Sequence, residues 1–317
     1  MNSKRGTLIV IGGPTGSGKS ALAVEIAKHF GAPIISTDSR QVFRNMAIGT
    51  AQPTTEELAA VKHYFIADRE VEDDFNCGRY EVEALALLDK LFAEYEYVVA
   101  VGGSGLYIQA LCSGMDALPE ADEALREELK QRLSNEGVES LFAELQRLDP
   151  AYAEVVDRCN PARVMRALEV CISTGRPYSE QRSGTIAERP FHIIKIATDM
   201  PRDILYERIN RRVDIMVEEG LVDEVRSLYP KRELNALQTV GYRELFDHFD
   251  GKCSMEEAIE LIKRNSRRYA KRQMTWFKRD EEFAWFSPSD LDAIIEHINH
   301  HDFLCTAHWP PDQECLS

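Results

Sequence analysis

Short runs of apolar residues alternate with amphipathic stretches over the first third of the chain. The β-branched runs at 7–11, 32–36 and 97–101 have the length of buried strands, whereas 21–27 and 80–93 have the spacing of helices. Strands that alternate with helices are typical of a parallel sheet whose right-handed crossovers cover both faces. The pattern therefore predicts an α/β fold.

The pattern changes near Gly114. From about Asp122 to Thr174 the periodic stretches have helical spacing and no run is typical of a strand; helices are expected at 123–134, 138–148 and 162–173. Strand character returns at 191–197 and again at 283–286, with helices expected between them at 202–219, 222–228 and 255–277. The predicted organisation is a core formed by 1–113 and 191–300, an all-helical insertion at 114–190, and an irregular tail at 301–317.

Composition places the chain among cytoplasmic globular proteins. It has 317 residues, 44% of them hydrophobic, and its apolar runs are too short to cross a bilayer. The first strand begins too early to leave room for a signal peptide, and seven scattered cysteines without a C-x-x-C pair indicate reduced thiols. The tail holds residues of metal-ligand type, but their spacing matches no zinc pattern: His300, His301, Cys305, His308 and Cys315.

One loop fits the phosphate-binding pattern G-x-x-x-x-G-K-[ST] between a predicted strand and a predicted helix: Gly13-Pro14-Thr15-Gly16-Ser17-Gly18-Lys19-Ser20. Glycines let backbone N–H groups surround an anion, and the helix N-terminus favours negative charge. Lys19 adds a cation and Ser20 a hydroxyl that can bind Mg²⁺. The loop predicts a site for a diphosphate or triphosphate; the alternative is a flexible glycine turn without a ligand.

Asp38 follows the second predicted strand and should lie at the sheet edge where the phosphate loop opens. There it can accept a proton or hold Mg²⁺ through water, although Asp in this position can also cap a helix. The third strand runs into Gly102-Gly103-Ser104-Gly105, without the carboxylate that ATPases commonly carry there. This weakens an ATPase interpretation and leaves the Ser104 hydroxyl near the phosphates.

A basic ridge is predicted on the helix at 255–277, formed by Arg264, Arg267, Arg268, Lys271 and Arg272. Like charges at these spacings repel one another, so either a polyanion or carboxylates of the protein itself must neutralise them. The net charge is −15, and such a local reversal favours nucleic-acid contact. Smaller arginine clusters occur at Arg158, Arg163 and Arg166 and at Arg208, Arg211 and Arg212.

Over about residues 7–287 the chain resembles the tRNA dimethylallyltransferases, also called tRNA isopentenyltransferases. The resemblance rests on motifs in a fixed order: Gly12–Ser20, Ile35–Ser39, Met46–Ala51, Val101–Tyr107, Asn160–Glu169, Thr239–Glu244 and Lys271–Phe277. Two positions depart from the family pattern, since Ser104 stands where Thr is usual and Gln52 where Lys is frequent.

The resemblance implies a P-loop NTPase-like fold and a prenyl transfer. The phosphate loop would hold dimethylallyl diphosphate, and the acceptor would be the exocyclic amine of the adenosine 3′ to a tRNA anticodon, flipped out of its stack. Asp38 would be the general base, with the Ser104 hydroxyl beside it. Lys19, Ser17 and Arg212 would stabilise the diphosphate, with Mg²⁺ near Ser20. A monomer is expected.

The same resemblance implies contacts with the anticodon stem-loop from three parts of the chain. One group surrounds the base: Asp38, Ser39, Arg40, Gln41 and Ser104. A second belongs to the helical insertion: Arg126, Ala162, Arg163, Val164, Met165 and Arg166. The third is the basic ridge.

Three other functions fit parts of the pattern. A nucleoside-monophosphate kinase would use ATP and Asp38 as base, and a nucleotide-gated RNA-binding protein would not catalyse. An adenylate isopentenyltransferase would prenylate free adenine nucleotides. The basic helix and the long insertion favour tRNA, since a small acceptor needs neither.

Overall fold

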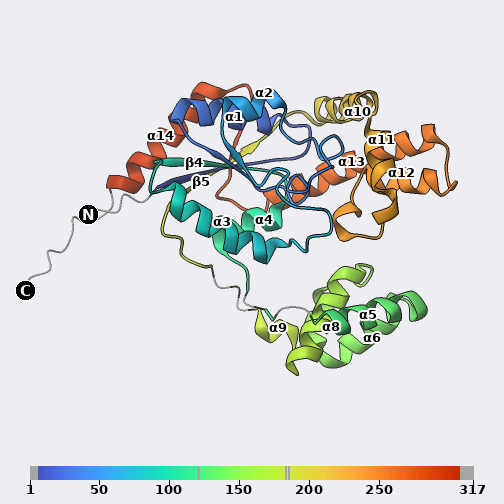
Figure 1. Ribbon diagram of the computed structural model, residues 1–317. Helices are drawn as coiled ribbons and strands as arrows, with labels where there is room; N and C mark the ends of the chain where they lie inside the picture. Colours follow the sequence, from blue (N-terminus) through green and yellow to red (C-terminus); the bar gives the residue numbers. More distant parts are fainter. Residues whose placement is uncertain (1–5, 117, 120–121, 183, 185, 308–317) are drawn as a thin grey trace, which may run out of the picture. The chain divides into compact units, whose positions relative to one another are not determined.

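The computed structural model describes residues 6–116, 118–119, 122–182, 184 and 186–307, with side chains described as far as residue 301. The chain divides into two compact units (Figure 1). Residues 1–113 and 188–317 form one, here called the core unit, and residues 114–187 form the other, the helical unit. The boundary expected at 190 therefore lies three residues earlier.

The core unit is built on a parallel sheet with the order β3-β2-β4-β1-β5-β6. Its strands are β1 (Thr7–Gly12), β2 (Ile34–Ser36), β3 (His63–Tyr64), β4 (Tyr97–Val101), β5 (His192–Thr198) and β6 (Ala284–Phe286). In the centre Ile9 pairs with Val99 on one side and with Ile194 on the other. The predicted parallel α/β sheet is confirmed. β3 was not predicted, because two residues are too short for a hydrophobic pattern.

Helices cover both faces of this sheet, as a buried parallel sheet requires. Along β1, Leu8 and Val10 pack into one apolar cluster and Ile9 and Ile11 into the other. The second cluster is completed by helices α1 (Lys19–Phe30) and α14 (Leu291–Ala307), and the first by α3 (Cys77–Leu91) and α4 (Gly105–Ser113) (Figure 1).

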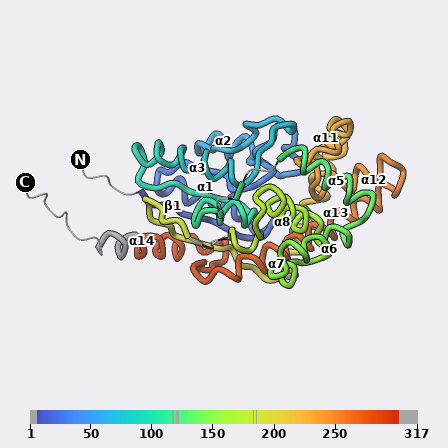
Figure 2. The backbone as a smooth tube through the Cα atoms, turned by 90° about the horizontal axis from the view of Figure 1, so that it is seen from below, coloured from blue at the N-terminus to red at the C-terminus, as the bar shows by residue number. Residues whose placement is uncertain are grey.

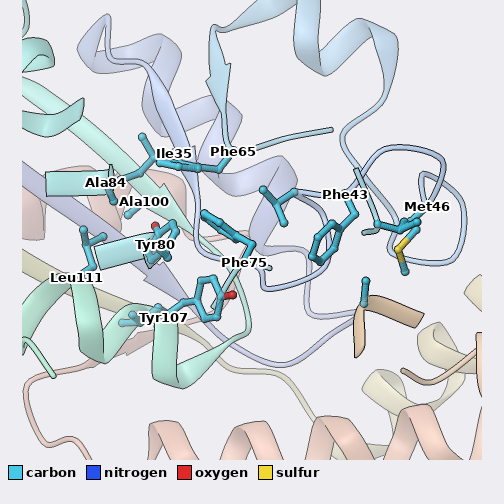
Figure 3. Close-up of a cluster of buried hydrophobic side chains, with 14 of the residues drawn as sticks. Ile35, Phe43, Met46, Phe65, Phe75, Tyr80, Ala84, Ala100, Tyr107 and Leu111 are labelled. Atoms are coloured by element: carbon cyan, nitrogen blue, oxygen red, sulfur yellow. The ribbon is translucent and has the colours of Figure 1, made fainter. Parts of the chain in front are cut away.

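Aromatic side chains fill the cluster on the α3 and α4 side (Figure 3). The ring centres of Tyr80 and Tyr107 lie 4.8 Å apart, and those of Phe65 and Tyr80 lie 5.1 Å apart. This packing fixes the beginning of α4, directly after the glycine turn that ends β4.

A group of helices extends the core unit beyond the sheet (Figure 2). It consists of α10 (Arg202–Glu218), α11 (Leu221–Leu228), α12 (Tyr242–Phe249) and α13 (Met255–Phe277), together with short 3₁₀ turns at Tyr229–Lys231 and Asn235–Leu237. α13 starts at a capping box in which Ser254 accepts from Glu257 N–H and Glu257 accepts from Ser254 N–H. A short helix α2 (Thr55–Ala60) precedes β3.

The helical unit has its own apolar core, which includes Leu129, Leu141 and Leu168. Its helices are α5 (Glu123–Glu136), α6 (Val138–Leu148), α7 (Pro150–Val155), α8 (Pro161–Thr174) and α9 (Tyr178–Gln181). Strands are absent from its described residues, as the sequence predicts. Asn160 caps α8, and Pro161 at the first helical position fits a helix start.

The predicted irregular tail is wrong for residues 301–307, because α14 continues to Ala307. Ile294 and Ile298 of this helix are fully buried against the sheet, and the helix continues for nine residues beyond Ile298. Of the tail residues singled out above, His308 and Cys315 lie outside the described residues. Within the described part of the chain no group of three or more His, Cys, Asp or Glu side chains is arranged for a metal ion, and no helix is long and apolar enough to cross a membrane.

Candidate active site

A cleft of about 380 Å³ opens at the carboxyl ends of the central strands of the core unit. The phosphate loop contributes Thr15, Lys19 and Ser20 to its lining, and the segment after β2 contributes Asp38, Ser39, Arg40 and Gln41. From the far side come Arg212 of α10 and Tyr269, Arg272 and Gln273 of α13. The structure thus brings together residues from both halves of the interrupted core.

The phosphate loop takes the conformation that its glycines permit. Gly13, Gly16 and Gly18 have φ of 146°, 81° and 90°. L-residues that carry a side chain rarely adopt such positive backbone angles. A Cβ at Gly13 would lie 2.2 Å from Thr198 Oγ1, so the loop also needs glycine for close packing. α1 begins at Lys19, directly after the loop. The predicted strand, glycine loop and helix are all present.

Ser17 differs from its predicted role. Its hydroxyl is fully buried, lies 2.6 Å from Thr198 Oγ1 at the end of β5, and does not line the cleft. The side chain therefore anchors the loop to the sheet and is not placed to stabilise a diphosphate.

Gln273 of α13 fastens the phosphate loop to the glycine turn after β4. Its Oε1 accepts from Thr15 N–H at 2.9 Å, and its Nε2 donates to the Gly103 carbonyl at 2.9 Å. A Cβ at Gly103 would lie 2.2 Å from Nε2, and one at Gly105 would lie 2.3 Å from the Trp276 ring. The glycine turn is thus the surface on which α13 packs.

Asp38 caps a turn with one carboxylate oxygen. Oδ1 accepts from Arg40 N–H at 2.8 Å and from Gln41 N–H at 3.3 Å, while Asp38 N–H donates to Ser36 Oγ at 3.2 Å. Within the residues that the structure describes, no protein group hydrogen-bonds Oδ2. No helix begins here, so the alternative of a helix cap is wrong; one oxygen caps a turn, and the other is left for a ligand.

Positive charge dominates the cleft. Its lining carries five cationic side chains, Lys19, Arg40, Arg212, Arg243 and Arg272, and two carboxylates, Asp38 and Glu57. The pKa of Lys19 is lowered to about 8, chiefly by burial and then by the Arg212 charge, while the Asp38 charge opposes the shift. Burial also lowers the pKa of Arg212, again opposed by Asp38. These cations repel one another when the cleft holds no anion.

Ser104 does not line the cleft itself but contacts a residue that does. Its Oγ accepts from Ser39 N–H at 3.0 Å and donates to Ser39 Oγ at 3.2 Å. Ser104 is not among the lining residues, whereas Ser39 and Tyr269 are. The structure thus places it against the turn that carries Asp38.

The sequence model of a family described as IPP transferase matches residues 41–280. The tRNA dimethylallyltransferase 1 of Phocaeicola vulgatus is 48% identical over 293 residues, which cover 92% of this chain and 98% of that protein. The tRNA dimethylallyltransferase of Cytophaga hutchinsonii is 50% identical over 291 residues, 92% of this chain and 96% of that protein.

The chain belongs to the IPP transferase family. A solved structure agrees: the full-length tRNA isopentenylpyrophosphate transferase from Bacillus halodurans is 39% identical, with a TM-score of 0.67 over 95% of this chain and 96% of that one.

In this member of the IPP transferase family the basic ridge of α13 is mostly unneutralised. Lys263, just before it, pairs with Asp214 and Glu260, and Arg267 donates to Asn210. Arg264, Arg268, Lys271 and Arg272 are exposed and have no carboxylate within 4.0 Å among the described residues of the core unit. Described acids of the core unit therefore do not balance these four positions.

The candidate RNA contacts of the helical unit fall into three groups. Val164 is fully buried in the apolar core, so its side chain cannot reach RNA, and its prediction as a contact is corrected. Arg126 and Arg166 both bind the buried carboxylate of Glu169, at 2.8 Å and 3.2 Å. Ala162 and Arg163 are exposed, while Met165 is half-buried. Exposure favours the beginning of α8 as the contact surface.

Glu224 was not predicted as a site residue. Its carboxylate accepts from Ile48 N–H at 2.8 Å, from Gly49 N–H at 2.9 Å and from Tyr242 O–H at 2.7 Å. Gly49 lines the cleft, so this clamp shapes one of its walls. The signal available in the sequence was the pair of family motifs at 46–51 and 239–244, which this carboxylate joins.

Gln52 also has a structural role. Its Nε2 donates to the Gln41 and Phe43 carbonyls at 2.9 and 2.8 Å. The position that is frequently Lys in the family therefore serves here to fasten the loop after β2.

Proposed function

We propose that this protein transfers a dimethylallyl group from dimethylallyl diphosphate to the exocyclic amine of the adenosine 3′ to a tRNA anticodon. The observation that carries this is the excess of three positive charges lining the cleft beside a carboxylate with one free oxygen. A diphosphate complements the cations, and the carboxylate complements an amine that must lose a proton. The names of the relatives, tRNA dimethylallyltransferases, support tRNA as the acceptor and a dimethylallyl group as the group transferred.

In the proposed reaction the adenine nitrogen attacks the first carbon of the dimethylallyl group. The bond from that carbon to the diphosphate oxygen breaks, and its electron pair leaves with the diphosphate. Asp38 Oδ2 takes the proton that the amine loses. Lys19 and Arg212 stabilise the charge that develops on the departing oxygens. Oδ1, held by two amides, keeps the carboxylate oriented throughout.

We propose Mg²⁺ as the metal cofactor. Ser20 and Asp38 bring hard oxygen donors to the cleft lining, and they supply fewer ligands than octahedral Mg²⁺ requires. This fits an ion whose remaining ligands are water molecules and oxygens of the bound diphosphate. When bound, Mg²⁺ would neutralise part of the leaving-group charge.

We propose that the anticodon stem-loop lies along the exposed part of the basic ridge and the beginning of α8. Four exposed cations on α13 and the exposed Arg163 supply phosphate contacts. Ser39, Arg40 and Gln41 line the cleft next to Asp38 and would surround the flipped base. The expected monomer remains a prediction, as does a cytoplasmic location.

The proposal is tested by mixing protein and Mg²⁺ with anticodon stem-loop RNA or free AMP, and with labelled dimethylallyl diphosphate or labelled ATP. We expect label in the RNA from the prenyl donor alone. Label in AMP at a higher kcat/KM would assign the adenylate activity instead, and phosphoryl transfer from ATP would assign a kinase. RNA binding without transfer of either label would leave only a binding protein.

Donor affinity should depend on pH above about 8. Lys19 is protonated below its lowered pKa of about 8, and a bound diphosphate favours the protonated form, so binding takes up a proton as the pH rises through this value. We expect Kd for dimethylallyl diphosphate to be constant from pH 7 to 7.5 and to rise up to about tenfold per pH unit above 8. Calorimetry in buffers of different ionisation enthalpy measures the proton uptake; none at pH 8.5 would contradict the charge assigned to Lys19.

A further inference from the structure

Glu169 places a carboxylate inside the helical unit. Its side chain is 4% exposed, and its neighbours on α8, Leu168 and Val170, are fully buried. A buried ion pair adds little stability compared with apolar side chains of the same volume, so a carboxylate at this position calls for another reason. Glu169 ends the motif that starts at Asn160, and the proposed function uses only the beginning of that motif.

Two arginines from different helices hold this carboxylate. Oε1 accepts from Arg126 Nε at 2.8 Å, and Oε2 accepts from Arg126 Nη2 at 3.3 Å and from Arg166 Nη1 at 3.2 Å. Arg166 Nη2 also donates to the Pro119 carbonyl at 2.9 Å. Each guanidinium is thus fixed by two hydrogen bonds, and the carboxylate ties α8 to α5.

Both guanidinium groups reach the surface although their common acceptor is buried. The side chains of Arg126 and Arg166 are 41% and 34% exposed. Two cations on one carboxylate leave one positive charge in excess. A guanidinium has five N–H donors, so one that binds a carboxylate with two of them can bind a phosphate with others. Arg163, which is exposed three residues before Arg166, lies on the same side of α8.

We propose that Glu169 is a positioning residue for RNA binding. It holds Arg126 and Arg166 in the orientation in which their guanidinium groups meet phosphates of the stem-loop, so that little side-chain freedom is lost when the RNA binds. The inference rests on the proposed tRNA acceptor. It gives an acidic residue a favourable effect on the binding of a polyanion, which is the opposite of what its charge alone would do.

The test replaces Glu169 by Gln in the full-length chain and measures stem-loop binding by fluorescence anisotropy. Whichever way the amide turns, its N–H groups face guanidinium donors, and the two arginines lose the anion that they share. We expect Kd for the RNA to rise about tenfold, the cost of ordering two long side chains on binding, with kcat and donor KM unchanged. Charge alone predicts a lower Kd, since the variant carries one negative charge fewer.

Glu144→Gln is the matched control. Glu144 joins α6 to α5 through Arg132 at 2.5 Å, so this variant also removes an interhelical carboxylate from the helical unit. Its Kd should be no higher than that of wild type, because Arg132 belongs to none of the proposed RNA contacts.

Arg126→Gln and Arg166→Gln show whether Glu169 acts through the two arginines. Each leaves one cation on the carboxylate, so the unit should stay folded, which circular dichroism checks. On either background Glu169→Gln should raise Kd only about threefold, because a single arginine remains to be misplaced.

Three results would overturn the inference. An unchanged or lowered Kd in Glu169→Gln would leave the carboxylate no positioning role. A tenfold rise on both arginine backgrounds, or loss of helix content in Glu169→Gln, would make its role purely structural. Failure of the wild-type protein to transfer a prenyl group, while RNA binding still depends on Glu169, would instead defeat the proposed function alone.

Discussion

Replacing Asp38 by Asn is expected to lower kcat for prenyl transfer by about 10²–10⁴-fold, the range that general base catalysis usually supplies. The amide oxygen of Asn can accept from Arg40 N–H and Gln41 N–H as Oδ1 does now, so the turn should persist. The amide nitrogen that replaces Oδ2 cannot take a proton from the acceptor amine. The substitution therefore isolates the chemical role of the second oxygen.

The KM for dimethylallyl diphosphate should not rise in this variant. Its loss removes one of the two carboxylates that line the cleft and so relieves repulsion of the diphosphate. Because Asp38 also raises the pKa of Lys19, the comparison is made at pH 7 or below, which favours protonated Lys19 in both proteins. Steady-state kinetics with each substrate varied, together with thermal unfolding, separates these effects. A weakened donor affinity with near-normal kcat would show that Asp38 binds the donor, through Mg²⁺, and is not the base.

The sequence predicted those features of the site that lie within short stretches. The phosphate loop, the position of Asp38 after β2 and the ridge on α13 each follow from local spacing, because backbone conformation and helix periodicity are local properties. β3 was not predicted because its two residues carry no hydrophobic pattern, and the strand forms through its pairing with β2. α14 was not predicted, and its last turns occupy residues 301–307, where an irregular tail was expected, because the helix continues past the residues that pack on the sheet.

Contacts that assemble the site across the chain could not be predicted. Ser17 is held by Thr198, 181 residues away, and Thr15 by Gln273, 258 residues away. Sequence spacing carries no information about such pairs. The family motifs marked the region of Gln273 and the loops that Glu224 joins, but the motifs alone do not distinguish a ligand contact from a structural one.

The error at Val164 had a signal in the sequence. Val164, Ala167, Leu168 and Cys171 follow i, i+3, i+4, i+7 spacing, which predicts a buried stripe on α8. The helix phase therefore separates Val164 from its neighbours Ala162 and Arg163, which are exposed.

Replacing Arg264, Arg268 and Lys271 of the basic ridge by Ala is expected to weaken stem-loop binding about 10²-fold near physiological salt. Each lost phosphate contact reduces the slope of log K against log[salt] by about 0.7–0.9, so the slope should become shallower by about 2–3. Binding measured by fluorescence anisotropy over a salt series gives both values. Donor KM should be unchanged, because these three side chains do not line the cleft.

Lys263→Ala on the same helix is the matched control. Its Nζ already pairs with Asp214 at 2.7 Å and with Glu260 at 3.3 Å, so its loss should leave the salt slope unaltered.

The triple variant should also unfold at no lower temperature than wild type, because Ala favours the helix and like-charge repulsion is relieved. A stabilised triple variant that binds RNA with the wild-type slope would show that the polyanion lies elsewhere. Weakened binding with that slope retained would mean that these side chains act through local structure and not through phosphates.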